Sequence, residues 1–132
     1  MRRLLRRLRD QGIRVAVVTS KQREDSVAEL AATGLDESVE LLIAFEDTEE
    51  HKPAAAPQLE ALCRLGADGG VGVGDLPSDV LSARAAGLSA FAVSWGYGEA
   101  EALRDAGAEQ ICETPDELER CLAQTLQDPR RG

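Results

Sequence analysis

The stretch GGVGVGDLPSDVLSARAAGLSAFAVSW, residues 69–95, decides the fold class of this chain. It begins with a run of small and apolar residues, which predicts a buried strand over 69–74. The helix predicted over 77–86 starts with a proline, which is favoured at early helical positions, and it stops before a glycine. A second apolar run predicts a strand over 89–95. Strand, helix and strand in this order form a βαβ unit, in which the two strands are parallel.

The same alternation extends over the rest of the chain. Further strands are predicted over 14–19, 39–45 and 109–112, and further helices over 21–33, 54–65 (opened by Pro53), 99–106 and 115–127. The Arg-rich opening, 1–12, has leucines at helical spacing and is interpreted as an amphipathic helix rather than a targeting peptide. We therefore predict one α/β domain over 1–127, with about five parallel strands in a three-layer Rossmann-like arrangement, and a frayed tail over 128–132.

The composition argues against several classes of function. The net charge of −9 disfavours a general affinity for nucleic acid or anionic membranes. No apolar run approaches the roughly 20 residues of a membrane span. The three cysteines lack metal-site spacing and indicate reduced thiols in a cytoplasmic protein. The glycines around residue 72 do not fit the G-x-G-x-x-G dinucleotide motif in any register. An acidic protein that handles an anionic substrate would need local positive charge, from a metal and a lysine.

Polar residues follow the predicted strands at their carboxyl ends. Thr19 and Ser20 follow the first strand, Lys52 lies in the loop after the second, and Asp75 and Asp79 follow the third. In a parallel sheet these ends share one edge, which is where ligands bind. We therefore expect a hydroxyl, an ammonium group and two carboxylates to gather around one phosphate-sized space.

Each of these residues also has a structural interpretation. Thr19 and Gln22 could form a capping box, or the hydroxyl could hold a phosphate at a helix N-terminus. Lys52 could be a solvated surface lysine. Its place before a helix N-terminus is electrostatically unfavourable unless an anion lies between them. Asp75 and Asp79 could cap a helix or bind Mg²⁺, which prefers one or two carboxylates together with water and substrate oxygens. The residues alone leave these alternatives open.

Four segments together resemble the haloacid dehalogenase-like (HAD) phosphatases, in particular the phosphoglycolate phosphatase group. VAVVTSK (15–21) resembles the second motif of that family, and HKPAAAP (51–57) resembles the third. VGDLPSDVLSARAAG (73–87) resembles the fourth motif, and WGYG (95–98) recurs in the group. The resemblance spans nearly the whole chain, with the motifs in order. It implies a Rossmann-like HAD core that hydrolyses small phosphomonoesters, such as phosphoglycolate, with Mg²⁺.

The resemblance also implies a role for each candidate residue. Thr19 would bind the phosphate, together with Ser20, which stands where many members have Asn. Lys52 would be catalytic by neutralising the phosphate and the nucleophile, and it would also bind the phosphate. Asp75 and Asp79 would hold the metal. The partner would be a small phosphorylated metabolite.

One part of the family pattern is missing. The family attacks phosphorus with the first aspartate of an Asp-x-Asp motif on a central strand, and no Asp-x-Asp occurs in these 132 residues. The resemblance places that strand between those predicted over 14–19 and 69–74. We therefore expect an N-terminally truncated HAD core without its nucleophile strand and cap, and inactive or severely impaired as it stands.

The same residues leave room for two other functions. A non-catalytic interaction domain would dock a partner strand at the incomplete sheet edge, or self-associate there, because unpaired edges capture strands. A receiver-like domain phosphorylated at Asp75 fits poorly, because the first strand ends in Thr-Ser rather than in an acidic cluster.

Overall fold

The computed structural model of the chain describes residues 2–96 and 98–126. The helices are α1 (Arg2–Asp10), α2 (Arg23–Thr33), α3 (Ala56–Leu65), α4 (Pro77–Ala85), α5 (Ala100–Asp105) and α6 (Pro115–Leu126). The strands are β1 (Ala16–Val18), β2 (Leu41–Ile43), β3 (Val71–Gly74), β4 (Ser89–Val93) and β5 (Gln110–Cys112). Two short 3₁₀ helices, η1 (Asp36–Ser38) and η2 (Phe45–Asp47), were not predicted. The predicted frayed tail, 128–132, lies outside the described residues.

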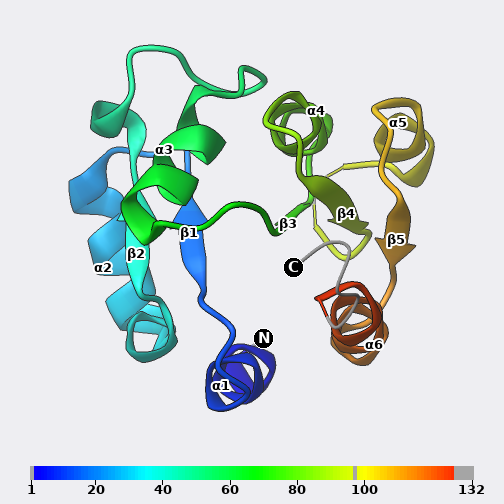
Figure 1. Cartoon of the computed structure of the whole chain (residues 1–132), viewed down its shortest axis with the longest axis horizontal. Coiled ribbons are helices and arrows are strands. Elements are labelled where there is room, and N and C mark those ends of the chain that lie inside the picture. Colours follow the sequence, from blue (N-terminus) through cyan, green and yellow to red (C-terminus); the bar gives the residue numbers. More distant parts are fainter. Residues whose placement is uncertain (1, 97, 127–132) are drawn as a thin grey trace.

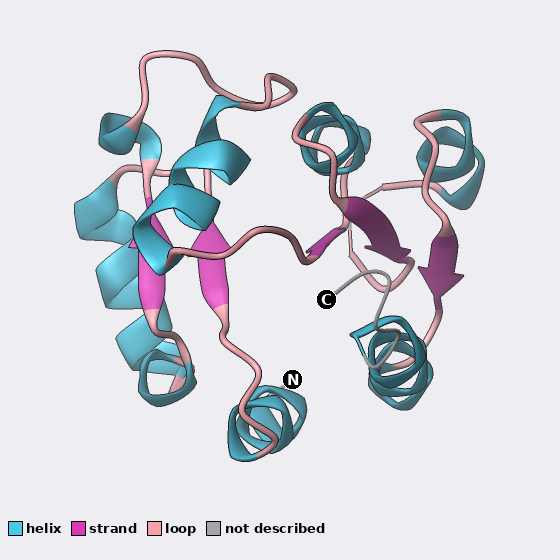
Figure 2. Cartoon of the chain, viewed as in Figure 1, coloured by secondary structure: helices cyan, strands magenta, loops and turns pink. Residues whose placement is uncertain are grey.

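The five strands form two separate sheets, and within each sheet the strands are parallel. One sheet has the order β1-β2 and the other has the order β3-β4-β5. Figure 2 shows the strands in two groups, and Figure 1 shows the chain crossing from one group to the other between α3 and β3. The predicted α/β class with about five parallel strands is confirmed. In the described part of the chain, β1 and β3 do not close up against each other, so each leaves one edge unpaired.

Strand β4 is the central strand of the three-stranded sheet. All five of its residues are buried, as expected for a parallel strand covered on both faces. Phe91 and Val93 pack into a cluster with leucines of α1 and α6. Ala90 and Ala92 point to the opposite side and pack into a cluster with side chains of α4 and α5. Helices therefore cover both faces of this sheet, which gives the predicted three layers.

Several helix ends follow the sequence, and two do not. Gly34 and Gly66 end α2 and α3 in the left-handed conformation, with φ of 73° and 67°, which glycine adopts without steric cost. Helix α3 begins at Ala56, two residues later than the predicted start at residue 54. Of the two alternatives for Thr19, the capping box is wrong, because α2 begins later, after Gln22, and has no side-chain cap at that residue.

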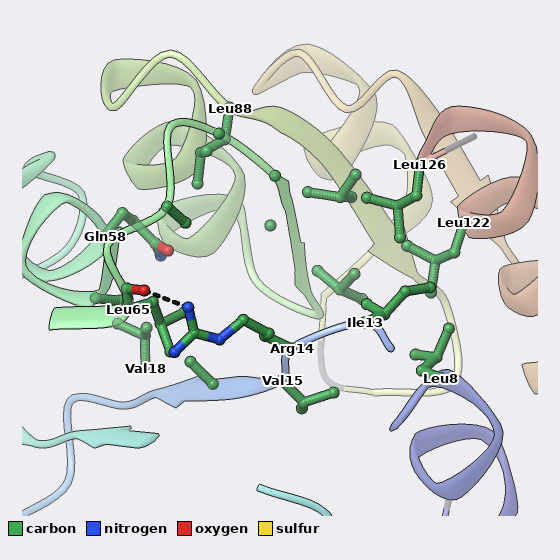
Figure 3. A pocket seen from close by; sticks show the side chains of 18 of the residues that line it. Leu8, Ile13, Arg14, Val15, Val18, Gln58, Leu65, Leu88, Leu122 and Leu126 are labelled. Carbon is green, nitrogen blue, oxygen red and sulfur yellow. Dashed lines mark hydrogen bonds between the residues drawn. The ribbon is translucent and has the colours of Figure 1, made fainter. Parts of the chain in front are cut away.

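A groove separates the two sheets. It has a volume of about 550 Å³ and is lined by residues on both sides, from β1 and β3, and by apolar side chains of α1, α3 and α6. Figure 3 shows Val15 and Val18 on the β1 side and Leu122 and Leu126 on the α6 side. The groove thus lies between the unpaired edges of β1 and β3, where the resemblance expected a missing strand.

Candidate functional site

Lys52 connects the two sheets at the end of the groove where β1 and β3 have their carboxyl ends. Its ammonium group donates to the backbone carbonyl of Val18, at 2.8 Å, and to Oδ1 of Asp79, at 2.6 Å. The lysine and aspartate side chains are only 12% and 14% exposed. Between two charges so little exposed the electrostatic attraction is stronger than between solvated surface charges, although their desolvation offsets part of it. The end of β1, the loop before α3 and the start of α4 therefore meet at one point.

Asp79 organises the loop that follows β3. Its Oδ2 accepts hydrogen bonds from the backbone N–H groups of Asp75 and Leu76, each at 3.2 Å. Asp79 thus caps α4 and also binds Lys52, so the capping interpretation of this residue is confirmed. Gly74 makes this arrangement possible, because a Cβ there would lie 2.2 Å from the Cβ of Asp79. Both oxygens of Asp79 are thus bonded to groups of the protein.

Thr19 lies next to Val18, at the same edge. Its amide donates to the carbonyl of Ile43 at 2.9 Å, and its hydroxyl oxygen accepts from the amide of Lys21 at 3.1 Å. This side chain therefore shapes a turn between β1 and α2 and does not cap the helix. Ser20, in the same turn, is exposed. Lys52, Asp79 and the carbonyl of Val18, the residue before Thr19, thus lie together where β1 and β3 end. The gathering of all four side chains around a phosphate, and their roles, stay predictions.

The sequence did not predict a cluster of polar contacts around Asp47, in the loop after β2. Asp47 is 14% exposed and accepts from the amide of Ala44 at 2.7 Å and from the guanidinium groups of Arg23 and Arg64. The amide of Ala44, and then Arg23 and Arg64, lower the pKa of the Asp47 carboxyl below its ordinary value of 3.8. The carboxylate of Glu46 accepts from the backbone N–H of Arg23 at 2.8 Å. The loop after β2 thereby caps α2 in place of the predicted box.

Ser82 was also missed. It is completely buried on α4, and its hydroxyl donates to the carbonyl of Ala54 at 2.6 Å. Ala54 lies two residues after Lys52, and Ser82 lies three residues after Asp79, on the same face of the helix. This bond therefore holds the loop of the lysine against the helix of the aspartate. A polar residue at helical spacing from Asp79 is the only sequence signal that could have indicated it.

The net charge of Lys52, Asp75 and Asp79 is negative, which favours a cation over an anion that comes without a metal. Lys52 supplies one positive charge, whereas Asp75 and Asp79 supply two negative charges. A phosphate dianion would be repelled from this set unless a divalent cation came with it. Within residues 2–96 and 98–126, no group of three or more His, Cys, Asp or Glu side chains forms a closed metal site. Asp75 and Asp79 could supply at most the one or two carboxylates that Mg²⁺ uses when water supplies its remaining ligands.

This chain is similar to known proteins over most of its length. Residues 1–93 match the family model of the haloacid dehalogenase-like hydrolases. The chain is 38% identical over 117 residues to a phosphoglycolate phosphatase of Cupriavidus necator, covering 87% of this chain and 51% of the relative. It is 37% identical over 101 residues to the pyrophosphatase PpaX of Bacillus pumilus, covering 75% of this chain and 47% of the relative. The chain thus spans about half the length of these curated relatives.

A solved structure shares the fold. The crystal structure of a hydrolase from Pseudomonas syringae superposes with a TM-score of 0.83 at 25% identity, over 92% of this chain and 57% of that one. In the described part of the chain, none of the helices has the length and apolar character needed to cross a membrane.

Proposed function

The chain belongs to the haloacid dehalogenase-like hydrolase family, and from this premise we propose that it supplies the phosphate-binding and metal-binding part of a phosphatase for small phosphorylated metabolites. The observation that carries the proposal is the contact of Lys52 with Val18 and Asp79, which joins the ends of β1 and β3 across the two sheets, beside Thr19. The similarity to a phosphoglycolate phosphatase and to a pyrophosphatase supports a phosphate ester or anhydride as the substrate.

Each candidate residue then has a distinct task. The hydroxyl of Thr19 and the turn that contains Ser20 hold the phosphate oxygens, and Lys52 neutralises part of their charge. Asp75 binds Mg²⁺ directly, and Asp79 holds Lys52 and the loop of Asp75 in place. Bound Mg²⁺ would offset the negative charge of the aspartates and the phosphate. These tasks amount to positioning and charge neutralisation, which dominate phosphoryl transfer.

The attacking group is the part that these residues do not provide. The family resemblance assigns the attack to an Asp-x-Asp pair, and the 132 residues contain none. We propose that the attacking carboxylate is borne by a strand that occupies the groove between β1 and β3. A strand there would pair with both open edges and bring its carboxyl end beside Lys52. The chain alone should therefore bind phosphate but turn over very little substrate.

Binding of inorganic phosphate in the presence of Mg²⁺, measured by calorimetry, tests the first part. We expect weak binding that Lys52→Met and Thr19→Val abolish. Arg7→Met is the matched control, because Arg7 is a half-exposed cation that pairs with Glu119, between α1 and α6. Equal binding by the chain and by Lys52→Met would contradict the proposed phosphate site.

Turnover of an aryl phosphate with Mg²⁺ tests the second part. The chain alone should show very little activity, and an added peptide with an apolar strand that ends in Asp-x-Asp should raise it. Substitution of the first aspartate of the peptide by Asn should remove the gain. The proposal that a separate strand supplies the attacking group would be contradicted by one result. In that result the chain alone turns over the substrate, and Asp75→Asn abolishes this activity.

A second candidate function is a non-catalytic domain that docks a partner strand in the same groove. The unpaired edges of β1 and β3 support it, because such edges can pair with a strand of another chain. It differs in its response to ligands, because its association would be indifferent to Mg²⁺ and phosphate. Light scattering with and without both ligands separates the two functions. A monomer at all concentrations would count against the docking domain.

A further inference from the structure

The loop after β4, of which the structure describes residues 94–96 and 98, has no role in the proposed function, although Gly96 and Gly98 stand out in the sequence. Hydrogen bonds tie Ser94 and Gly98 to neighbouring segments. The amide of Ser94 donates to the carbonyl of Cys112, at 3.0 Å, and the amide of Gly98 donates to the carbonyl of Asp75, at 2.9 Å. The loop therefore lies against the segment that carries the candidate metal ligand.

Gly96 approaches Asp75 more closely than any other residue type could. A Cβ at this position would lie 2.3 Å from both the Cβ and Oδ2 of Asp75, and a real Cβ keeps at least about 3.0 Å from other heavy atoms. The φ of Gly96 lies outside the left-handed region, so its backbone conformation does not require glycine. The space beside Asp75 requires it instead.

We infer that Gly96 is a positioning residue for Asp75 and thereby sets the affinity of the site for a divalent cation. Its backbone closes one side of the Asp75 side chain and restricts where the carboxylate oxygens can lie. A side chain at residue 96 would push the carboxylate away from this position or lift the loop. This inference rests on the proposed function, which makes Asp75 the metal ligand.

Binding of Mn²⁺ to the whole 132-residue chain, followed by the electron paramagnetic resonance signal of the free ion, tests the inference. Gly96→Ala should weaken binding by about 10- to 100-fold, the usual effect of disturbing a group that orients a metal ligand. Gly70→Ala is the matched control, because a Cβ at Gly70 meets nothing within 4 Å and its φ is not positive. This variant should bind within about twofold of the unsubstituted chain.

A stability measurement identifies the contact independently of any metal. Gly96→Ala should lower the melting temperature, and this loss should largely disappear when Asp75→Gly removes the side chain that the new Cβ would meet. If Gly96→Ala does not fold alone, the double variant should recover the fold. An equal loss in both backgrounds would show that the clash lies elsewhere, and would overturn the inference.

The possible results separate the inference from the proposed function. If the chain binds Mn²⁺ and Gly96→Ala binds it equally well, the inference is wrong and the proposed function stands. If the unsubstituted chain binds no Mn²⁺ at millimolar concentration, the proposed metal role fails and the inference fails with it. Loss of binding in Gly96→Ala but not in Gly70→Ala, together with rescue of stability by Asp75→Gly, would support both.

Discussion

Replacing Lys52 by methionine tests the contact on which the site depends. The substitution keeps most of the side-chain volume but removes the ammonium group that binds Val18 and Asp79. Removing one partner of a buried ion pair costs about 3–5 kcal/mol, because the other charge is left without compensation. Two features favour the lower end of this range. Both side chains are slightly exposed, and Asp79 keeps two hydrogen bonds from backbone amides. We therefore expect a loss of about 3 kcal/mol.

This loss is large enough to measure by thermal unfolding. A chain of 132 residues has an unfolding entropy of about 0.28 kcal/mol/K, so 3 kcal/mol corresponds to a melting temperature lower by about 11 °C. Arg7→Met removes an exposed partner instead and should change the free energy of unfolding by at most about 1 kcal/mol. Chemical denaturation at fixed temperature provides an independent value.

A double-mutant cycle decides whether the loss comes from the pair. Lys52→Met combined with Asp79→Asn removes the uncompensated charge and leaves an amide oxygen to cap α4. The double variant should therefore be more stable than the sum of the two single losses predicts, by at least about 1 kcal/mol. A loss below about 1 kcal/mol for Lys52→Met, or strict additivity in the cycle, would refute the reasoning.

Other predictions concern the rest of the chain. The pKa of Asp47 is lower in the folded than in the unfolded chain, so its stabilising effect is complete above 3.8 and is lost as the pH falls through the folded pKa. Asp47→Asn should thus lower the urea midpoint at pH 7 and flatten its acid dependence below about pH 4. Ser82→Ala should cost about 1–2 kcal/mol in urea unfolding, because it leaves a carbonyl unpaired. Ser26→Ala should be neutral or stabilising, since the buried Ser26 hydroxyl has no hydrogen-bond partner among the described residues. At pH 8 an alkylating reagent should modify the exposed Cys63 first, as mass spectrometry would show, because burial raises the pKa of Cys112 to about 12.

The fold followed from local signals in the sequence. Runs of apolar or small residues predicted four of the five strands, most clearly β4, which is buried along its whole length. The short β5 followed instead from the alternation of strands and helices. The helix ends at Gly34 and Gly66 were predictable because only the local backbone decides them. The start of α3 was not, because Pro53 is also favoured in turns and the chain makes a turn before Ala56.

The sequence predicted those features of the site that depend only on the order of strands and loops along the chain. The loops of Thr19, Lys52 and Asp75 converge because parallel strands bring their carboxyl ends to one edge. The contact between Lys52 and Asp79 and the capping of α2 by Glu46 join segments at least 23 residues apart, and no local pattern predicts which partner a charged group will find. The space that Gly96 leaves for Asp75 depends on two loops and is equally invisible to local patterns.

The ammonium group of Lys52 carries three protons, and the contacts described above engage two of them. The third can point at an incoming anion while the other two go on tying the two sheets together. Anion binding and the contact between the two sheets would then stabilise each other, because both involve the ammonium group of Lys52. A rise in melting temperature with phosphate that disappears in Lys52→Met would be the thermodynamic signature of this shared use.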